Sequence, residues 1–157
     1  MGRVYRIPMN QVAVSLSQDL WSIKAGPLKP VRIHGFMIAQ STDFGDAQEE
    51  GWVLLLKRNN SSATQGSGGT TPTSAAQMTS DTAVGFTAHI NDTTKATGGA
   101  AVVEEPHVWN NRMPYSYFYP PELRPYIAPG ELKTLELASP GADAMTMSGC
   151  MYVEEEG

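Results

Sequence analysis

The sequence is poor in cysteine and contains no long apolar run. Its single cysteine, Cys150, cannot form an internal disulfide, so the fold does not depend on an oxidising compartment. No stretch approaches the ~20 apolar residues that a membrane-spanning helix needs, and the first residues do not resemble a signal peptide. We therefore expect a protein that is made and folded in the cytoplasm and has no membrane partner.

Charged residues are scarce as well. They make up 17% of the 157 residues, and 16 acidic residues against 11 basic ones give a formal net charge of -5. A protein that binds nucleic acid mainly through phosphates needs a basic surface, so nucleic acid is not an expected partner. Glycine, serine, threonine and proline fill the gap, which is typical of short strands joined by many turns.

Sustained helical periodicity is also absent, whereas apolar and polar residues alternate with a period of two in many places. About eight short strands with turn signals between them predict an all-β, antiparallel sandwich or barrel, in a single domain over residues 1–157. Residues 31–40 have apolar side chains on both faces, so we expect that strand to be covered on both sides. The clearest strand is the last one. We expect its core face to carry Met145, Met147, Met151 and Val153, and its opposite face to carry Thr146, Ser148 and Tyr152.

Residues 59–82 depart from this pattern. They are rich in glycine, serine, threonine and asparagine and have no apolar periodicity. Such a segment cannot bury enough apolar surface to order itself, and it is longer than most connections. We expect an exposed, flexible loop whose deletion leaves the fold intact.

Little in the sequence resembles catalytic machinery, and we expect neither an enzyme nor a cofactor or metal. Residues 43–45 spell the Asp-Phe-Gly motif of kinases but lack the other loops that this chemistry requires, so a turn is the simpler interpretation. The histidines, His34, His89 and His107, lie in different strands without close ligand spacing, which favours polar-face side chains over a zinc site. Cys150 has no local activating signature, which indicates a buried or interface thiol.

The most informative segment covers residues 109–121, WNNRMPYSYFYPP. Tyrosine and tryptophan combine a large contact area with a polar group and are favoured at interfaces, and proline lowers the entropy lost on binding. The rings could equally close one end of the core, because both arrangements bury aromatic surface. The candidate interface residues are Trp109, Tyr115, Tyr117, Phe118 and Tyr119.

Several segments together resemble small proteins of tailed bacteriophages and their relatives in bacterial genomes. They are RVYRIP at residues 3–8, PVRIHGFMIAQSTDFGDA at 30–47, the Gly/Ser/Thr-rich loop, ELRP at 122–125 and MSGCMYVEE at 147–155. The resemblance covers nearly the whole chain and carries no catalytic signature. It implies a jelly-roll-like sandwich and a virion structural role. We expect a capsid decoration (cement) protein on the capsid exterior, a homotrimer whose partner is the major capsid protein.

Two alternatives stay open. A carbohydrate- or ligand-binding β-sandwich of a tail or fibre would use the aromatic segment as a sugar platform. An enzyme on a jelly-roll scaffold would have to depend on the scattered histidines. Location on a virion shell favours the first hypothesis, binding to glycans the second, and stoichiometric bound metal the third.

Overall fold

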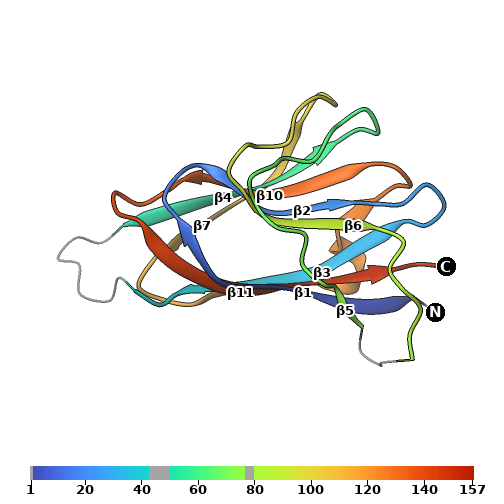
Figure 1. The fold of residues 1–157 in the computed structure, drawn as a ribbon, viewed down its shortest axis with the longest axis horizontal. Coiled ribbons are helices and arrows are strands. Elements are labelled where there is room, and N and C mark those ends of the chain that lie inside the picture. The colour runs from blue at the N-terminus through green and yellow to red at the C-terminus, as the bar shows by residue number, and fades with distance from the viewer. Residues whose placement is uncertain (1, 43–49, 77–79) are drawn as a thin grey trace.

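The computed structural model describes residues 2–42, 50–76 and 80–157, and its regular structure is almost entirely β (Figure 1). The strands are β1 (Arg3–Val14), β2 (Gln18–Lys24), β3 (Val31–Gln40), β4 (Gly51–Asn59), β5 (Ala75–Ala76), β6 (Thr87–Asp92), β7 (Val102–Asn110), β8 (Tyr115–Phe118), β9 (Tyr126–Ile127), β10 (Leu132–Ser139) and β11 (Met145–Glu155). One 3-10 turn, η1 (Pro121–Leu123), follows β8. The first sheet has the order β5-β1-β11-β3-β8, with β9 also paired to β3, and the second has the order β6-β2-β10-β4-β7.

Eight of these strands form a long antiparallel ribbon that is rolled up into the two sheets. The pairs along the ribbon are β1 with β11, β2 with β10, β3 with β8, and β4 with β7, and they alternate between the sheets. Pairing of β11 with β3 and of β10 with β4 joins them within each sheet. This is the eight-stranded jelly-roll arrangement. The predicted all-β, jelly-roll-like sandwich is confirmed, and β5, β6 and β9 add to the roughly eight strands expected.

The facing sides of the two sheets form one hydrophobic core. Its largest fully buried side chains include Trp21 of β2, Trp52 of β4, Tyr5 of β1 and Phe36 of β3. Removal of such apolar surface from water drives folding, at roughly 25 cal/mol per Å². The predicted alternation of β11 is confirmed. The core side carries the buried residues Met145, Met147, Met151 and Val153, and the outer face carries the half-buried residues Thr146, Ser148 and Tyr152.

The prediction that residues 31–40 are covered on both sides is wrong. Ile33 pairs with Val153 of β11, whereas Gly35 pairs with the preceding residue of that strand, so His34 is an extra residue at a β-bulge. A bulge of this kind exchanges the two faces of a strand. Ile33 and Phe36 therefore both enter the core, and Met37 points outward.

The chain between β4 and β7 crosses the outer face of the second sheet. Two of its stretches, residues 60–72 and 93–101, are joined by antiparallel bridges, one of them between Thr64 and Thr97. We call these two stretches the arm. In Figure 1 they are the green and yellow loops that lie together above β2 and β10. The Gln65 side chain and the backbone of the arm then make polar contacts with the sheet below.

Those contacts fix the arm in place. The side-chain amide of Gln65 donates a hydrogen bond to the carbonyl of Ser22 at 3.0 Å, and Lys24 Nζ donates to the carbonyl of Ala63 at 2.8 Å. The Ala63 side chain is buried. Each contact joins residues far apart in the sequence, so the arm is ordered by the sheet and not by its own composition.

The prediction of an exposed loop over residues 59–82 is therefore corrected in part. Asn59 is buried as the last residue of β4, residues 60–72 belong to the arm, and residues 75–76 form β5. Residues 77–79 lie outside the described residues. Because removal of the arm would uncover buried polar groups, we no longer expect this segment to be dispensable.

Three carboxylates lie almost completely buried beneath the arm, on the outer face of the second sheet: Asp19, Asp92 and Glu136. Glu136 accepts hydrogen bonds from Lys57 of β4 and, at 2.8 Å, from Lys95 of the arm. Burial disfavours the Glu136 carboxylate, but these two lysines outweigh it and lower its pKa. Glu136 is thus a fixed anion that binds the arm to the sheet.

Asp19 has the opposite balance. Its carboxylate accepts the backbone N–H of Ala96 at 2.7 Å, and it pairs across the strands with Asp92. Burial, together with the nearby charges of Glu136 and Asp92, raises the pKa of Asp19 to about 6, although the Ala96 N–H opposes this. Protonation of Asp19 therefore stabilises the folded protein.

Replacement of Asp19 by asparagine should flatten the pH dependence of stability. Because the pKa of Asp19 is raised on folding, its protonation contributes stability that is fully present below about pH 4. This contribution is lost as the pH rises through about 6. The ordinary value is 3.8, and the difference corresponds to something on the order of 3 kcal/mol. Urea unfolding between about pH 4 and pH 7 should show a smaller loss of unfolding free energy in Asp19→Asn than in the wild type.

The matched control is Asp143→Asn, since Asp143 is exposed at the turn before β11. It should retain the pH dependence of the wild-type protein. Identical profiles for Asp19→Asn and Asp143→Asn would show that the carboxylate beneath the arm does not titrate in this range.

Candidate functional site

The outer face of the first sheet differs from that of the second, because the arm does not cover it. On this face, Met37 of β3 is 44% exposed and Phe118 of the edge strand β8 is 55% exposed. Tyr152 and Cys150 lie beside them and are half-buried. Cross-strand pairing explains the grouping: Cys150 lies opposite Met37, and Tyr152 and Phe118 lie on either side of Gly35. We call Met37, Phe118, Cys150 and Tyr152 the outer patch.

A glycine at the bulge of β3 permits this grouping. The rings of Phe118 and Tyr152 approach to 5.5 Å between centroids, one from each neighbour of β3. A Cβ atom at Gly35 would lie 2.6 Å from Phe118 Cδ1 and 2.5 Å from the carbonyl oxygen of Tyr117. Only glycine allows the rings and backbone to come so close. Tyr152 Oη also donates to Met37 Sδ at 3.7 Å, which holds the patch together.

A shallow groove of about 360 Å³ extends the outer patch towards the β7–β8 turn. Its lining is mostly apolar and comes from three strands and that turn: Met37, Ile38, Ala39, Pro114, Tyr115, Ser116, Ser148, Gly149 and Cys150. Burial raises the pKa of the Cys150 thiol. A thiol with a raised pKa is a weak nucleophile and a good packing group, which suits a contact surface.

Charged groups border the outer patch on one side. Glu154 lies 2.8 Å from His34 Nε2 and 3.9 Å from Arg124, while Arg32 donates a hydrogen bond to Glu156. These pairs are half-buried at the surface, where such pairs are typically worth roughly 0–1 kcal/mol, so a partner can exchange them at little cost. An apolar centre with a polar rim is the usual anatomy of a protein–protein interface.

The structure divides the five aromatic residues that the sequence analysis selected. Trp109 and Tyr119 are buried, with exposed fractions of 8% and 5%, and Tyr115 is half-buried. Tyr117 is partly exposed, at 37%, on the core side of β8, and Phe118 belongs to the outer patch. The structure therefore does not place them on one common surface.

The inward-facing rings close the sandwich at the edge formed by β7 and β8, and we call them the edge cluster: His107, Trp109, Tyr115, Tyr117 and Tyr119. Trp109 stacks on Tyr115 at 5.6 Å with an angle of 29° between the planes, and it contacts Trp52 of the core at 5.7 Å. Tyr117 meets Tyr119 edge to face at 4.9 Å. The sequence left interface and core closure equally open, and the geometry favours closure for Trp109, Tyr115 and Tyr119.

The histidines also lie apart. His107 belongs to the edge cluster, with Nδ1 3.0 Å from Tyr115 Oη, and burial lowers its pKa although Glu105 opposes this. His34 lies on the first sheet beside Glu154, and His89 lies on β6 of the second sheet, 3.1 Å from Asp92. In the part of the chain that the structure describes, no group of His, Cys, Asp and Glu residues could hold a metal ion. The Asp-Phe-Gly motif at residues 43–45 lies outside the described residues.

Sequence reasoning missed Met37 as a surface residue. Regular alternation assigns it to the same face as Ile33, and the β-bulge at His34 reverses that assignment. The only available signal was Gly35 within an otherwise apolar strand, because an isolated glycine in a strand indicates a bulge or a close approach. The position of Tyr152 on the outer face, in contrast, followed from the alternation of β11.

Comparisons with known proteins give no relatives: no family model, no curated protein and no solved structure matches this chain. In the described residues no helix has the length and apolar character needed to cross a bilayer. The case for a function therefore depends on the geometry of the chain itself and on the sequence resemblance described above.

Two alanine substitutions should separate the core rings from the outer patch. Trp109→Ala removes a buried, stacked ring and should lower the free energy of unfolding by about 3–5 kcal/mol. Phe118→Ala removes a half-exposed ring and should cost roughly 1 kcal/mol or less. Guanidinium unfolding of both variants measures this. Equal losses would mean that Phe118 packs as a core residue, and the outer patch would then be smaller than described.

Proposed function

We propose that the protein is a structural component of a tailed-phage virion, a decoration (cement) protein on the outside of the capsid. The observation that carries the proposal is the asymmetry of the sandwich. The arm covers one outer face, and the other face presents the outer patch, its groove and a rim of ion pairs. Jelly rolls serve in viral capsids and in lectins, so the fold alone does not decide. The sequence resemblance to phage proteins favours the capsid.

In this role the protein acts mechanically, and its partner is the major capsid protein. Burial of Met37 and Phe118 against the shell contributes roughly 25 cal/mol per Å² of apolar surface. The patch lies on β11, β3 and the edge strand β8 of one sheet, where the backbone is already ordered, so little conformational entropy is lost on binding. A protein that binds the assembled shell but not free subunits stabilises the shell by mass action.

We further propose that the protein assembles as a homotrimer, through the edge at β7. Val102, Val103 and Val108 of this strand are exposed, as is Met113 in the turn that follows. Pro106 lies in the middle of β7 and lacks an N–H group, which disfavours direct strand pairing across the edge. Side-chain packing between symmetry-related subunits suits such an edge better.

The alternative of a carbohydrate-binding tail or fibre protein loses much of its original basis. It required residues 109–121 as a platform of exposed rings. Trp109 and Tyr119 are buried and Tyr115 is half-buried in the edge cluster. A flat aromatic surface for a sugar is therefore not available at that segment.

Co-sedimentation with phage heads tests the proposal. Heads from a phage lacking this gene should bind the purified protein saturably, and sedimentation equilibrium beforehand gives the oligomeric state of the free protein. The double variant Met37→Asp/Phe118→Asp should bind roughly tenfold more weakly or worse, because it places charges in the apolar centre.

Leu16→Asp is the matched control, since Leu16 is an exposed leucine in the β1–β2 loop, outside the outer patch. It should bind like the wild type. Failure of the wild-type protein to bind heads would contradict the capsid role. Equal binding by the wild type and the double variant would contradict the outer patch as the docking surface.

A further inference from the structure

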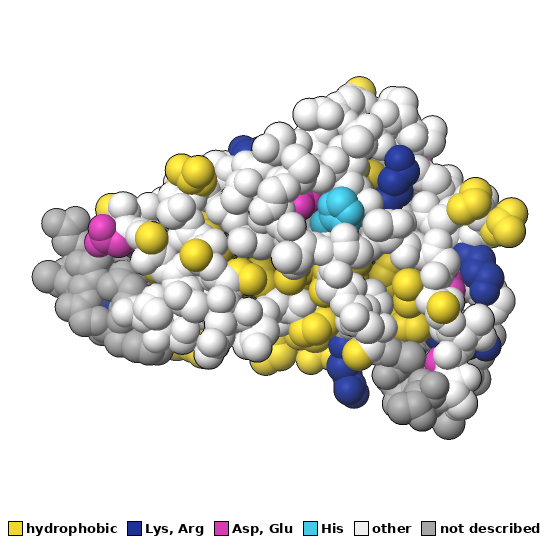
Figure 2. Space-filling view, viewed as in Figure 1, with side chains coloured by type: hydrophobic (Ala, Val, Ile, Leu, Met, Phe, Trp, Pro, Cys, Tyr) yellow, Lys and Arg dark blue, Asp and Glu magenta, His cyan; other side chains and the backbone are white. Residues whose placement is uncertain are grey.

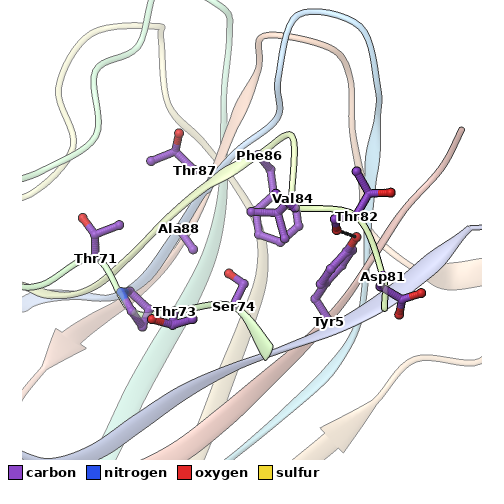
Figure 3. A pocket seen from close by; sticks show the side chains of 12 residues that line it. Tyr5, Thr71, Thr73, Ser74, Asp81, Thr82, Val84, Phe86, Thr87 and Ala88 are labelled. Carbon is purple, nitrogen blue, oxygen red and sulfur yellow. Dashed lines mark hydrogen bonds between the residues drawn. The ribbon is translucent and has the colours of Figure 1, made fainter. Parts of the chain in front are cut away.

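Near the edge where β5 and β6 extend the two sheets, the polar atoms of the buried aromatic rings are hydrogen-bonded. Figure 2 shows hydrophobic side chains gathered in a band between the two layers on this side of the molecule. Tyr5 of β1 packs edge to face on Phe86 at 5.6 Å, and Tyr5 Oη donates to the carbonyl oxygen of Thr82 at 3.1 Å (Figure 3). The indole N–H of Trp21 likewise donates to the carbonyl of Ile7 at 3.2 Å. These atoms follow the general rule for polar groups in a protein interior.

One end of the sandwich differs, where β4 begins and β7 ends, at the left of Figure 1. Three buried polar atoms there have no hydrogen-bond partner among the residues that the structure describes: Trp52 Nε1, Glu50 Oε2 and Asn111 Oδ1. The Trp52 side chain is fully buried, and Asn111 is only 2% exposed. A buried polar group without a partner is costly, so three at one place indicate a bound molecule that satisfies them.

Strand pairing brings the three residues together. Trp52 of β4 lies opposite Trp109 of β7, and beyond this pair the backbone N–H of Asn111 donates to the carbonyl of Glu50 at 3.2 Å. The side-chain amide of Asn111 donates to Met145 Sδ at 3.9 Å, which shows that this side chain faces the core. Glu50 and Asn111 therefore flank Trp52 at the end of the core.

The turn between β10 and β11 closes this corner of the core at Gly141. A Cβ atom at Gly141 would lie 2.1 Å from Glu50 Oε2 and 3.0 Å from Met145 Cε. It would also lie 3.1 Å from Trp52 Cζ2, a ring atom on the nitrogen side of the indole. The carboxylate, the indole edge and the methionine that contacts Asn111 thus converge on one point.

The orientation of the Glu50 carboxylate is fixed by its other oxygen. Glu50 Oε1 accepts the backbone N–H of Ala142 at 2.8 Å, and this bond ties the residue before β4 to the β10–β11 turn. Oε2 is left on the inner side, where it is buried. The carboxylate cannot turn Oε2 towards solvent without giving up the bond to Ala142.

We propose that this corner binds one structural water molecule, which accepts a hydrogen bond from Trp52 Nε1 and donates to Glu50 Oε2 and Asn111 Oδ1. Buried waters typically make about three hydrogen bonds to otherwise unsatisfied polar groups. A water molecule can accept and can donate twice, so it matches one N–H group and two oxygen atoms. A metal ion suits the corner less well, because the indole nitrogen can only donate.

The water joins three segments that are far apart in the sequence. They are the start of β4, the β7–β8 turn that begins at Asn111, and the β10–β11 turn held by Glu50. The β7–β8 turn carries Pro114, which lines the groove beside the outer patch. The bound water therefore positions one border of that groove from inside the molecule.

Water–protein NOE and ROE spectra of the ¹⁵N-labelled full chain test the proposal. The Trp52 indole proton should show cross-peaks to water with opposite signs in the two spectra, the signature of a water molecule held much longer than surface hydration water. The Trp21 indole is the matched control, because it is also fully buried but donates to the carbonyl of Ile7. Its proton should show no such cross-peak.

Variants then locate the water. Glu50→Leu/Asn111→Leu replaces both acceptors by apolar groups and should remove the cross-peak of Trp52. Asp143→Leu is the control variant, because Asp143 is an exposed acid in the same β10–β11 turn, and it should retain the cross-peak. The amide spectrum of each variant verifies its fold. A crystal structure of the wild type should show the water about 2.7–3.2 Å from Trp52 Nε1.

Absence of the cross-peak in the wild type would overturn the proposal, and this result does not depend on whether a variant folds. A direct hydrogen bond from Trp52 to Glu50 or Asn111 in the crystal would also overturn it, as would an ion at ligand distances of about 2.3–2.6 Å. Persistence of the cross-peak in the folded double variant, or its loss in Asp143→Leu, would count equally against it. None of these outcomes bears on head binding through Met37 and Phe118.

Discussion

The need to satisfy three carboxylates on the outer face of the second sheet determines the rest of the molecule. Asp19, Asp92 and Glu136 are almost completely buried, and buried charges require partners. Lys95 and the backbone N–H of Ala96 come from the arm to meet them. The arm is therefore fixed over β2, β4 and β10, and a segment whose composition suggests disorder becomes a structural layer.

One consequence of this constraint is a sandwich with two unlike outer sides. The outer face of the second sheet is polar beneath the arm, and the outer face of the first sheet carries the apolar outer patch. The outer patch exists because Gly35 lets the rings of Phe118 and Tyr152 approach across β3. The same connection that covers one face also supplies β5 and β6, which extend the two sheets at one edge. One long connection thus accounts for both the covered face of the second sheet and two short edge strands.

How far the sequence predicts this structure depends on whether the deciding contacts are local. The alternation of β11 is a local pattern, so the buried set around Met147 and the outward position of Tyr152 follow from it. The bulge at His34 depends on the register with β11, far away in the sequence, and regular alternation misassigns Met37. The order of the arm depends likewise on distant bonds, such as that between Gln65 and Ser22. Aromatic content alone did not separate core closure from an interface.

We propose that the open face of the first sheet docks on a symmetric protein shell. Electron cryomicroscopy of the native particle, at a resolution that shows side chains, is the most direct test. Under this proposal we expect density for this jelly roll on the capsid exterior, with Met37 and Phe118 buried against the major capsid protein and the arm facing solvent. Absence of the protein from the head, or contact through the arm while the outer patch stays exposed, would contradict it.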